Sequence, residues 1–592
     1  MKTSINPNVF SDPPALYRPG YFWLLNGKLD SDTLVAQLRE MAALGAKSVC
    51  PHPIPPEFRP DSHSTMTPEY LSDAYFRALE PVLDEAEKLG VNWLLYDEGG
   101  WPSGSACGQV WASDPEHFTR LFLISDGGGG VKVVHEENCP AESAPIPDLL
   151  HSGVAQKFIE LTHERYRHFF GRHFGKTIRV VFTDEPAYLP PGPGRLAWTV
   201  DFAAEFRRRQ GYDIEPWLPR LLDYQTRFRD ESTRVRIDYY DTLAQLFTER
   251  FLLPVRDWCR RHGLIFGGHF GGEDEPRICS SLGYGHLLRS LRALDMPGVD
   301  VIWRQLYPEI RRHPFPKYAS SIANQAGHKL VLGEIFAIYG TGLTPNVMKW
   351  IIDYLLVRGV NSFIASCIHQ NHSKGAMSGR GFGPINPLWK YFRHFHDYAG
   401  RAAYLLTRGR PVVDTAVYFD IRSRWCGGDT ADNADSWHWD ISLELLQRRC
   451  GFDYLDDDAL MTAEIVGCKL HVGVMAYETV VLPFHSELAA GVAEKLAAFQ
   501  AAGGRVRTPD ELDQCPALIK IVPETDKLRV CKRKIGGTAL YFIVNESSIP
   551  VSVSLEIPEK KALVRCDPES GKFYLVQSSD GRWRWNFAPF GS

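Results

Sequence analysis

The stretch Arg179-Val-Val-Phe-Thr-Asp-Glu-Pro186 contains, in eight residues, the pattern that decides the fold. A short apolar run ends in two acids and a proline. An amphipathic stretch, Ala155–Phe174, precedes it, and Gly175 lies between the two, where a left-handed glycine can end a helix and turn the chain into a strand. This order is typical of the βα units that build a parallel sheet.

The same alternation repeats on both sides of this stretch. The candidate strands are Tyr21–Asn26, Ser48–His52, Asn92–Asp97, Arg179–Asp184, Leu264–His269, Val299–Trp303, Leu330–Glu334 and Ser362–His369. The candidate helices are Asp32–Leu44, Pro68–Leu89, Ala155–Phe174, Arg234–His262, Tyr318–Ala326, Pro345–Val357 and Pro387–Leu406. Eight consecutive units predict an α/β fold in which residues 1–410 form a closed (β/α)8 barrel, a TIM barrel.

After Gly409 the pattern changes. Apolar runs at 412–419, 452–455 and 479–483, with helical stretches at 437–449 and 488–502, predict a small open α/β domain over residues 411–514, of the flavodoxin or amidotransferase type. No G-x-G-x-x-G follows its first strand, which argues against a dinucleotide site. Alternating stretches at 539–544 and 551–557 predict a C-terminal antiparallel β domain over residues 515–592.

Composition limits the classes of function. The 592 residues carry 66 basic and 71 acidic side chains, a net charge of −5, which argues against a nucleic-acid partner. No apolar run reaches the ~18 to 20 residues of a membrane span, and Met1–Pro14 lacks the apolar core of a signal peptide. We therefore expect a cytoplasmic protein with no membrane partner. The twelve cysteines form no C-x-x-C pair, unlike those of a zinc ribbon.

The predicted barrel strands end in polar side chains. In chain order these are Asn26, His52, Asp97 with Glu98, Asp184 with Glu185, His269, Asp300 with Arg304 beyond it, Glu334 and His369. A strand of a parallel barrel is buried on both faces, so polar residues are expected at its carboxyl end only where the following loop builds a site. Each buried titratable group also costs desolvation. The sequence therefore predicts an active site at the C-terminal mouth of the barrel.

Glu185 and Glu334 form the strongest candidate catalytic pair. Glycoside hydrolysis needs two carboxyl groups across one glycosidic bond, one to protonate the leaving oxygen and one to act as nucleophile or to activate water. Strands four and seven can face each other across a substrate in an eight-stranded ring. The alternative for either glutamate is an ion pair with a rim base such as Arg304.

A second cluster is Tyr96-Asp-Glu-Gly-Gly-Trp-Pro-Ser-Gly104, in which a buried strand leads into two acids and a glycine-rich loop. Carboxylates of this kind hold sugar hydroxyls, and Trp101 can stack on a sugar ring. The alternative is a tight turn whose acids cap neighbouring helices. The predicted substrate contacts are, in full, Asn26, His52, Asp97, Glu98, Trp101, Asp184, His269, Asp300, Arg304, Tyr339 and His369.

Two other classes of function stay open. The first is a sugar-binding protein on a decayed barrel, which would keep oligosaccharide binding without hydrolysis. The second is a metal-dependent hydrolase or isomerase with His269, Glu273 and His369 as ligands, although histidines on loops are a weak metal signal. Ser105 lacks the glycine two residues before it that a nucleophile elbow requires, so serine chemistry is not expected.

Several segments resemble the α-L-rhamnosidases of glycoside hydrolase family 106. They are Tyr21-Phe-Trp-Leu-Leu-Asn-Gly-Lys-Leu29, Leu95-Tyr-Asp-Glu-Gly-Gly-Trp-Pro-Ser-Gly104, Gly333-Glu-Ile-Phe336, Leu343-Thr-Pro-x-x-x-Lys349 and Leu356-Val-Arg-Gly-Val-Asn361. The resemblance covers about two thirds of the chain, mainly the predicted barrel. It implies a TIM-barrel hydrolase of glycoside or oligosaccharide substrates, acting as an exo-enzyme on rhamnosides.

The resemblance also implies roles for particular residues. Glu185 corresponds to the strand-four catalytic glutamate and Glu334 to its strand-seven partner. Where the family motif is Asp-Ser-Trp-Glu, this chain has Asp184 directly before Glu185, so the register of the catalytic acid is open at this point. The family implies calcium, but no loop has an EF-hand-like run of ligands, so we assign no cofactor. A homodimer is compatible with the sequence.

Overall fold

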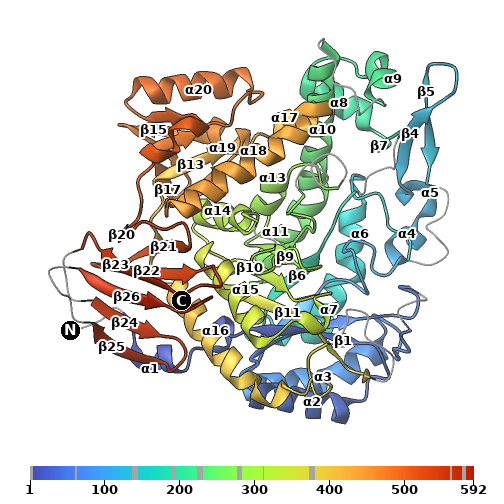
Figure 1. The fold of residues 1–592 in the computed structure, drawn as a ribbon. Helices are drawn as coiled ribbons and strands as arrows, with labels where there is room; N and C mark the ends of the chain where they lie inside the picture. The colour runs from blue at the N-terminus through green and yellow to red at the C-terminus, as the bar shows by residue number, and fades with distance from the viewer. Residues whose placement is uncertain are drawn as a thin grey trace.

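The computed structural model describes residues 5–59, 63–136, 144–188, 194–222, 231–275, 283–310, 313–372, 381–559, 563–576 and 582–592, without the side chains of Thr341 and residues 428–437. Its centre is a closed barrel of eight parallel strands covered by helices, and further sheets lie beside it (Figure 1). The helix α1 (Pro7–Ser11) lies beside the C-terminal strand β25 (Lys572–Val576), where the rings of Phe10 and Phe573 are 5.0 Å apart.

The ring confirms the predicted barrel and its eight strands. In order around the ring, which is also chain order, the strands are β1 (Gly20–Leu25), β2 (Ser48–Pro53), β3 (Asn92–Tyr96), β6 (Ile178–Asp184), β8 (Ile265–His269), β9 (Met296–Val301), β10 (Leu332–Ile335) and β11 (Ser362–His369), and β11 pairs with β1. The predicted strand ends differ from the observed ones by up to three residues, most at the sixth strand, which begins at Met296 and not at Val299. The sixth strand ends at Val301 and not at Trp303, because the backbone of Trp303 turns into the left-handed region, with φ 53°.

Side chains of the strands alternate between the barrel interior and the surrounding helices, as the pleat of a strand requires. The interior cluster includes Phe22, Leu24, Leu94, Tyr96, Val180 and Phe182, whereas Trp23, Leu95 and Val181 belong to the cluster shared with the helices. On β6 the next inward position after Phe182 is Asp184. The alternation that builds the core therefore also carries an acid to the top of the barrel interior.

Helices cover the outside of the barrel, including α2 (Ser31–Ala43), α3 (Asp73–Leu89), α11 (Leu253–Arg261), α14 (Pro316–Ala326), α15 (Pro345–Val357) and α16 (Phe392–Leu406). Gly90 and Gly175 have positive φ, 62° and 73°, as expected of glycines that turn the chain from a helix toward a strand. Between β3 and β6 the chain adds an antiparallel sheet of β4 (Leu121–Ser125), β5 (Val131–His135) and β7 (Arg195–Trp198). Residues 127–130, four glycines, form the turn between β4 and β5.

A second parallel sheet follows the barrel in the sequence. Its order is β14 (Phe452–Leu455), β13 (Thr415–Tyr418), β18 (Thr479–Val481) and β19 (Arg505–Arg507), and helices α18 (Gly428–Gln447), α19 (Asp457–Thr462) and α20 (Ala490–Ala501) connect or cover these strands. A small antiparallel sheet of β15 (Glu464–Val466), β16 (Lys469–Val472) and β17 (Met475–Tyr477) is inserted before β18. Three to four residues per strand are too few to show an alternating pattern, so the sequence did not predict this insertion.

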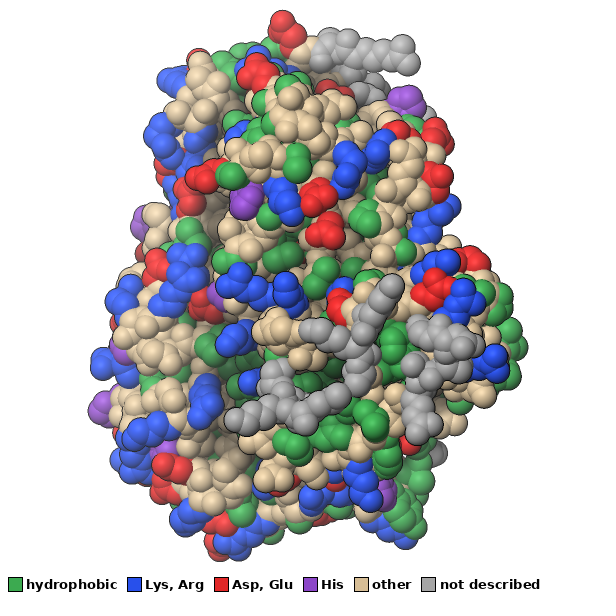
Figure 2. All heavy atoms as spheres, turned by 90° about the vertical axis from the view of Figure 1, so that its left-hand side faces the viewer, with side chains coloured by type: hydrophobic (Ala, Val, Ile, Leu, Met, Phe, Trp, Pro, Cys, Tyr) green, Lys and Arg blue, Asp and Glu red, His purple; other side chains and the backbone are tan. Residues whose placement is uncertain are grey.

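The C-terminal part is antiparallel. Its pairs join β21 (Leu528–Ile535) to β22 (Thr538–Asn545), β23 (Val551–Glu556) to β20 (Lys520–Val522) and β26 (Trp583–Phe587), and β24 (Leu563–Asp567) to β25. The short strand β12 (Arg410–Pro411), at the predicted end of the barrel domain, pairs with β21. On the face drawn in Figure 2, basic and acidic side chains are interspersed. In the described part of the chain, no helix is long and apolar enough to cross a membrane.

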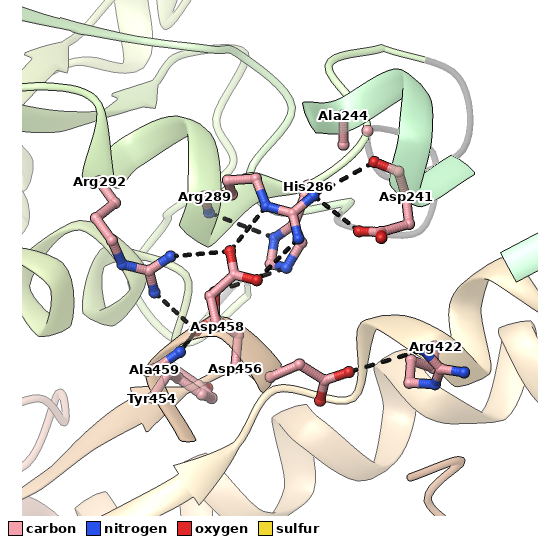
Figure 3. Close-up of polar contacts among 12 residues, drawn as sticks. Asp241, Ala244, His286, Arg289, Arg292, Arg422, Tyr454, Asp456, Asp458 and Ala459 are labelled. Carbon is pink, nitrogen blue, oxygen red and sulfur yellow. Dashed lines mark hydrogen bonds and ion pairs between the residues drawn. The ribbon is translucent and has the colours of Figure 1, made fainter. Parts of the chain in front are cut away.

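Ion pairs attach the second parallel sheet to the barrel (Figure 3). Arg289, on α13 (Leu287–Arg292), lies between Asp241 of α10 (Glu231–Phe247) and Asp458 of α19. Its guanidinium nitrogens are 2.7 and 2.9 Å from the two oxygens of Asp458 and 2.9 Å from Asp241. Arg292 pairs with Asp456 at 2.7 Å. Ion pairs therefore join α13, the helix before β9, to α10 on one side and to the residues that follow β14 on the other.

Candidate active site

Four neighbouring strands each bring one titratable side chain to the same level of the barrel interior. In the strand register Asp184 of β6 is the partner of His269 of β8, and Asp300 of β9 is the partner of Glu334 of β10. All four residues are buried, with at most 8% of their surface exposed. The structure therefore brings together four residues that the sequence predicted only as separate strand ends.

His269 lies at the centre of this group. Its Nε2 is 2.8 Å from Oε2 of Glu334 and 3.6 Å from Oδ1 of Asp184. Burial by itself lowers the pKa of His269, but the carboxyl groups of Asp300, Glu334 and Asp184 outweigh burial and raise this pKa well above its ordinary value. We therefore describe His269 as a cation that donates a hydrogen bond from Nε2 to Glu334.

Glu185 follows β6 directly, and its backbone has φ 47°, which interrupts the in-and-out alternation of the strand. Its N–H donates to the carbonyl oxygen of His269 at 3.2 Å. Its side chain is partly exposed and lies against Gly271, so closely that a Cβ on Gly271 would be 2.2 Å from Oε1 of Glu185. Burial raises the pKa of Glu185 to about 8, with further contributions from the carboxyl groups of Asp184, which is the largest of these, Glu334 and Glu273.

Burial also raises the pKa of Glu334, to about 7, although the hydrogen bond from His269 favours the ionised form. Asp300 is more strongly affected, because burial and the charge of Glu334 raise its pKa well above the ordinary value. Within the described part of the chain, Oδ1 of Asp300 and Nδ1 of His269 have no hydrogen-bond partner. The arrangement offers a proton on Glu185 and a carboxylate on Glu334 at one end of the barrel.

Glu98 holds the loop that follows β3. Its Oε2 accepts N–H bonds from Gly104, Ser105 and Ala106 at 2.8 to 3.0 Å, and its Oε1 accepts from Gly99 and Cys107 at 2.8 and 2.5 Å. The residue is fully buried. This geometry resembles the turn-capping alternative more than direct contact with a sugar.

Glu273 does the same for the loop after β8. One oxygen accepts the N–H groups of Phe270 and Gly271 at 3.0 and 3.1 Å, and the other accepts the N–H of Asp300 at 3.3 Å. Sequence reasoning treated Glu273 only as a possible metal ligand. The signal that could have found its role is an acid directly after two glycines that follow a strand, where backbone N–H groups need acceptors.

Most of the other predicted contacts are buried and bonded within the protein. Asn26 exchanges two hydrogen bonds with the backbone of Asn371 at 3.1 and 2.8 Å. His52 stacks on Tyr96 and donates from Nε2 to the carbonyl of Gly100 at 3.2 Å. Further contacts join Asp97 to Ser103, His369 to Cys367 and the hydroxyl of Tyr339 to the carbonyl of Leu306. These side chains hold the loops of the mouth in place.

Three side chains at the mouth are exposed or partly so. Trp101 packs on the ring of Phe58 and has the guanidinium of Arg59 4.9 Å above it. Arg304 is exposed, donates from Nε to the carbonyl of Tyr339, and has no carboxylate partner among the described residues. Trp303 is 62% exposed. Sequence reasoning missed Trp303 as a contact because it placed this residue inside a strand.

Strained backbone conformations gather at the same ends of the strands. Glu185, Trp303, Arg304, Phe336 and Ile338 have φ between 47° and 79°, a region that non-glycine residues seldom adopt. They directly follow β6, β9 and β10. Backbone strain of about 1 to 3 kcal/mol per residue is kept mainly where it serves a site.

The donor set does not fit the calcium that the family resemblance implies. Two groups of possible ligand atoms lie within 4.8 Å of one another here, Asp184–His269–Glu334 and Glu185–His269–Asp300. Calcium takes about six to eight oxygen ligands, whereas a histidine nitrogen is central to both groups and already bonds Glu334. Among the described residues, the predicted set of His269, Glu273 and His369 forms no such group.

A closed parallel barrel with a partly exposed glutamate and a second carboxyl group at its carboxyl end is the architecture of barrel glycoside hydrolases. The family model for glycoside hydrolase family 106, alpha-L-rhamnosidase, matches residues 130–528. The chain belongs to this family, which confirms the resemblance read from the sequence.

Solved structures share the fold. A rhamnosidase from Novosphingobium sp. PP1Y superimposes with a TM-score of 0.73 at 14% identity, over 100% of this chain and 83% of that one. A family 42 beta-galactosidase from G. stearothermophilus superimposes with a TM-score of 0.65 at 10% identity, over 98% of both chains. A Formosa agariphila protein named "Putative beta-glucuronidase" is 28% identical over 234 residues, which are 38% of this chain and 19% of that protein. The matched region thus spans about a fifth of this curated relative.

Proposed function

We propose that the chain hydrolyses O-glycosides, with α-L-rhamnosides as the leading substrate class and exo cleavage as the mode. The observation that carries this proposal is the pairing of a partly exposed Glu185, whose pKa is raised to about 8, with Glu334, whose carboxyl accepts a hydrogen bond from His269. Family membership and the names of the similar proteins support rhamnose as the sugar.

Glu185 is the general acid in this proposal. A raised pKa keeps its proton at neutral pH, and partial exposure lets it reach the leaving oxygen. Glu334 is the base or nucleophile, because His269 stabilises its carboxylate form. Trp101, Trp303 and Arg304 have the exposure needed to contact a substrate. Glu98 and Tyr339 act by holding loops.

The test is a screen of aryl glycosides, α-L-rhamnoside included, with wild type, Glu185→Gln and Glu334→Gln. Loss of the general acid is expected to cost about 100- to 10,000-fold on substrates with poor leaving groups and much less on a dinitrophenyl glycoside. Glu334→Gln should lose activity on both. Glu160→Gln, an exposed glutamate on α6 (Val154–Leu161), is the matched control and should behave as wild type. Active Glu185→Gln and Glu334→Gln variants would refute the assignment.

The anomer formed first distinguishes the two roles of Glu334. NMR of an α-rhamnoside digest should show α-rhamnose if Glu334 is a nucleophile and β-rhamnose if it activates water. A wild type that binds oligosaccharides and cleaves none would favour the sugar-binding alternative. The ligand set predicted for the metal-dependent alternative, His269, Glu273 and His369, does not assemble among the described residues.

Several finer predictions accompany this proposal. The chain divides into a barrel domain, a small α/β domain and a C-terminal β domain, with boundaries near 410 and 514. The protein is cytoplasmic, needs no cofactor, and forms a homodimer if it is not a monomer. Limited proteolysis and light scattering test the domain boundaries and the oligomeric state.

A further inference from the structure

The hydroxyl of Tyr96 lies between two oxygen atoms. Its Oη is 2.9 Å from the carbonyl oxygen of Gly100 and 2.5 Å from Oδ2 of Asp184. Both distances are those of hydrogen bonds between oxygen atoms. All three groups belong to the top of the barrel interior, and Tyr96 and Asp184 are 1% and 7% exposed.

The protons available to this chain of oxygens are limited. Tyr96 has one O–H, and the carbonyl of Gly100 can only accept. If Asp184 were ionised, the single proton of Tyr96 would have to serve two acceptors, and one contact would be a close approach of lone pairs. Both contacts are hydrogen bonds only if Tyr96 donates to Gly100 and Asp184 donates from Oδ2 to Tyr96.

We propose that Asp184 is a neutral carboxylic acid at neutral pH, and that it positions the charges of the active site instead of acting as the catalytic acid. The role in catalysis rests on the proposed function of Glu185 and Glu334. The assignment also chooses between the two adjacent acids that the sequence left open.

Titratable groups face Asp184 from several elements. They are Tyr96 at the end of β3, Asp97 directly after it, Cys50 from β2, His269 from β8, Glu334 from β10 and the adjacent Glu185. The acids oppose ionisation of Asp184, whereas His269 and the hydroxyl of Tyr96 favour it. His269 is the cation in this set, and it lies nearer to Glu334, at 2.8 Å, than to Asp184, at 3.6 Å. Burial raises the pKa of the Asp184 carboxyl.

A neutral Asp184 has two consequences. The cation of His269 then has Glu334 as its main partner. The hydrogen bond from His269 therefore stays on the carboxylate that acts as base or nucleophile. Because the adjacent Asp184 carries no charge, it does not oppose the negative charge that Glu185 acquires when it gives up its proton. An ionised Asp184 would compete for His269 and would oppose that ionisation.

The first test compares Asp184→Asn with Asp184→Ala. Asparagine keeps a neutral side chain of the same shape whose amide can donate to Tyr96. Asp184→Asn should therefore keep at least about ten times the kcat/KM of Asp184→Ala. The alkaline limb of the pH profile should not move in Asp184→Asn. An ionised Asp184 predicts the opposite, because removing its charge lowers the pKa of Glu185 and moves that limb to lower pH. A loss in Asp184→Asn like that of Glu334→Gln, or an active Asp184→Ala, would overturn the proposal.

The second test needs no substrate. The infrared difference spectrum of wild type minus Asp184→Asn at pH 7 should contain the C=O band of a protonated carboxyl group. A difference that contains only carboxylate bands overturns the proposal. If Asp184→Asn does not fold, Tyr96→Phe should shift the same band, since it removes the acceptor, and an unmoved band is again a refutation. If the protein cleaves no glycoside, the proposed function is refuted, but the infrared spectrum still tests the protonation of Asp184.

Discussion

Gly271→Ala is expected to impair the general acid Glu185 by displacing its carboxyl group, although Glu185 itself is not substituted. A Cβ at this position would meet Oε1 of Glu185 at 2.2 Å and its Cδ at 2.8 Å. Gly271 also has φ 74°, where an alanine is strained. The substitution therefore pushes the carboxyl group of Glu185 away from the mouth position that its role requires.

The size of the effect follows from the distances. An ordinary van der Waals contact begins near 3.4 Å, so Oε1 has to retreat by about 1.2 Å, the difference between 3.4 and 2.2 Å. A misplacement of about 1 Å can cost about 100-fold in rate, which corresponds to ~2.7 kcal/mol of transition-state stabilisation. The left-handed backbone adds a loss of about 1 to 2 kcal/mol in the free energy of unfolding.

The assay compares kcat on two aryl rhamnosides. The loss should approach 100-fold for a poor leaving group and be much smaller for a dinitrophenyl group, which needs little protonation. Gly263→Ala is the matched control, because Gly263 has φ 70° and no atom within 4 Å of its added Cβ. It should show the same loss of stability with wild-type kcat. Equal rate losses in both variants, or a Gly271→Ala enzyme with wild-type kcat, would refute the reasoning.

Three further predictions concern the pH profile, the loop after β3 and the mouth. The profile of kcat/KM should be a narrow bell, falling below pH about 7 as Glu334 gains a proton and above about 8 as Glu185 loses one; a profile flat from pH 5 to 9 would contradict both roles. Glu98→Gln should lower the free energy of unfolding by about 2 to 4 kcal/mol, because its amide nitrogen would face at least two of the five N–H donors, which urea denaturation would measure. Trp303→Ala should raise KM for oligosaccharides about 3- to 10-fold through lost stacking and leave the thermal midpoint within a few degrees; an unchanged KM would exclude this platform.

Sequence reasoning found the barrel because its signal is local and repeated. Eight short apolar runs, most of them following a helical stretch, match the eight strands. The largest differences are at β9, which spans Met296–Val301 and not Val299–Trp303, and whose preceding helix α13 was not predicted. At Trp303 and Arg304 two consecutive left-handed residues end the strand. No composition signal marks such a turn when neither residue is a glycine.

The candidate site was predicted less completely. The rule that polar strand ends build a site located Asp184, His269, Asp300 and Glu334. It also selected Glu98, whose side chain bonds the backbone of its own loop, and Asn26, whose side chain bonds the backbone of the loop after β11. An acid beside a glycine-rich turn looks the same in the sequence whether it meets a sugar or five backbone N–H groups. Only the folded loop shows which donors it receives.

By itself, then, the sequence determined the class of fold, the order of the barrel strands, the family and the two glutamates worth testing, because these depend on periodicity and on residue types at strand ends. The tertiary structure decided which role each of these acids has. Register places Asp184 beside His269, 85 residues away in the chain, and Glu334 beside Asp300, 34 residues away. Which carboxyl group holds a proton depends on burial, on the single hydroxyl of Tyr96 and on distances of 2.8 and 3.6 Å from one imidazole, and such distances exist only after the barrel has closed.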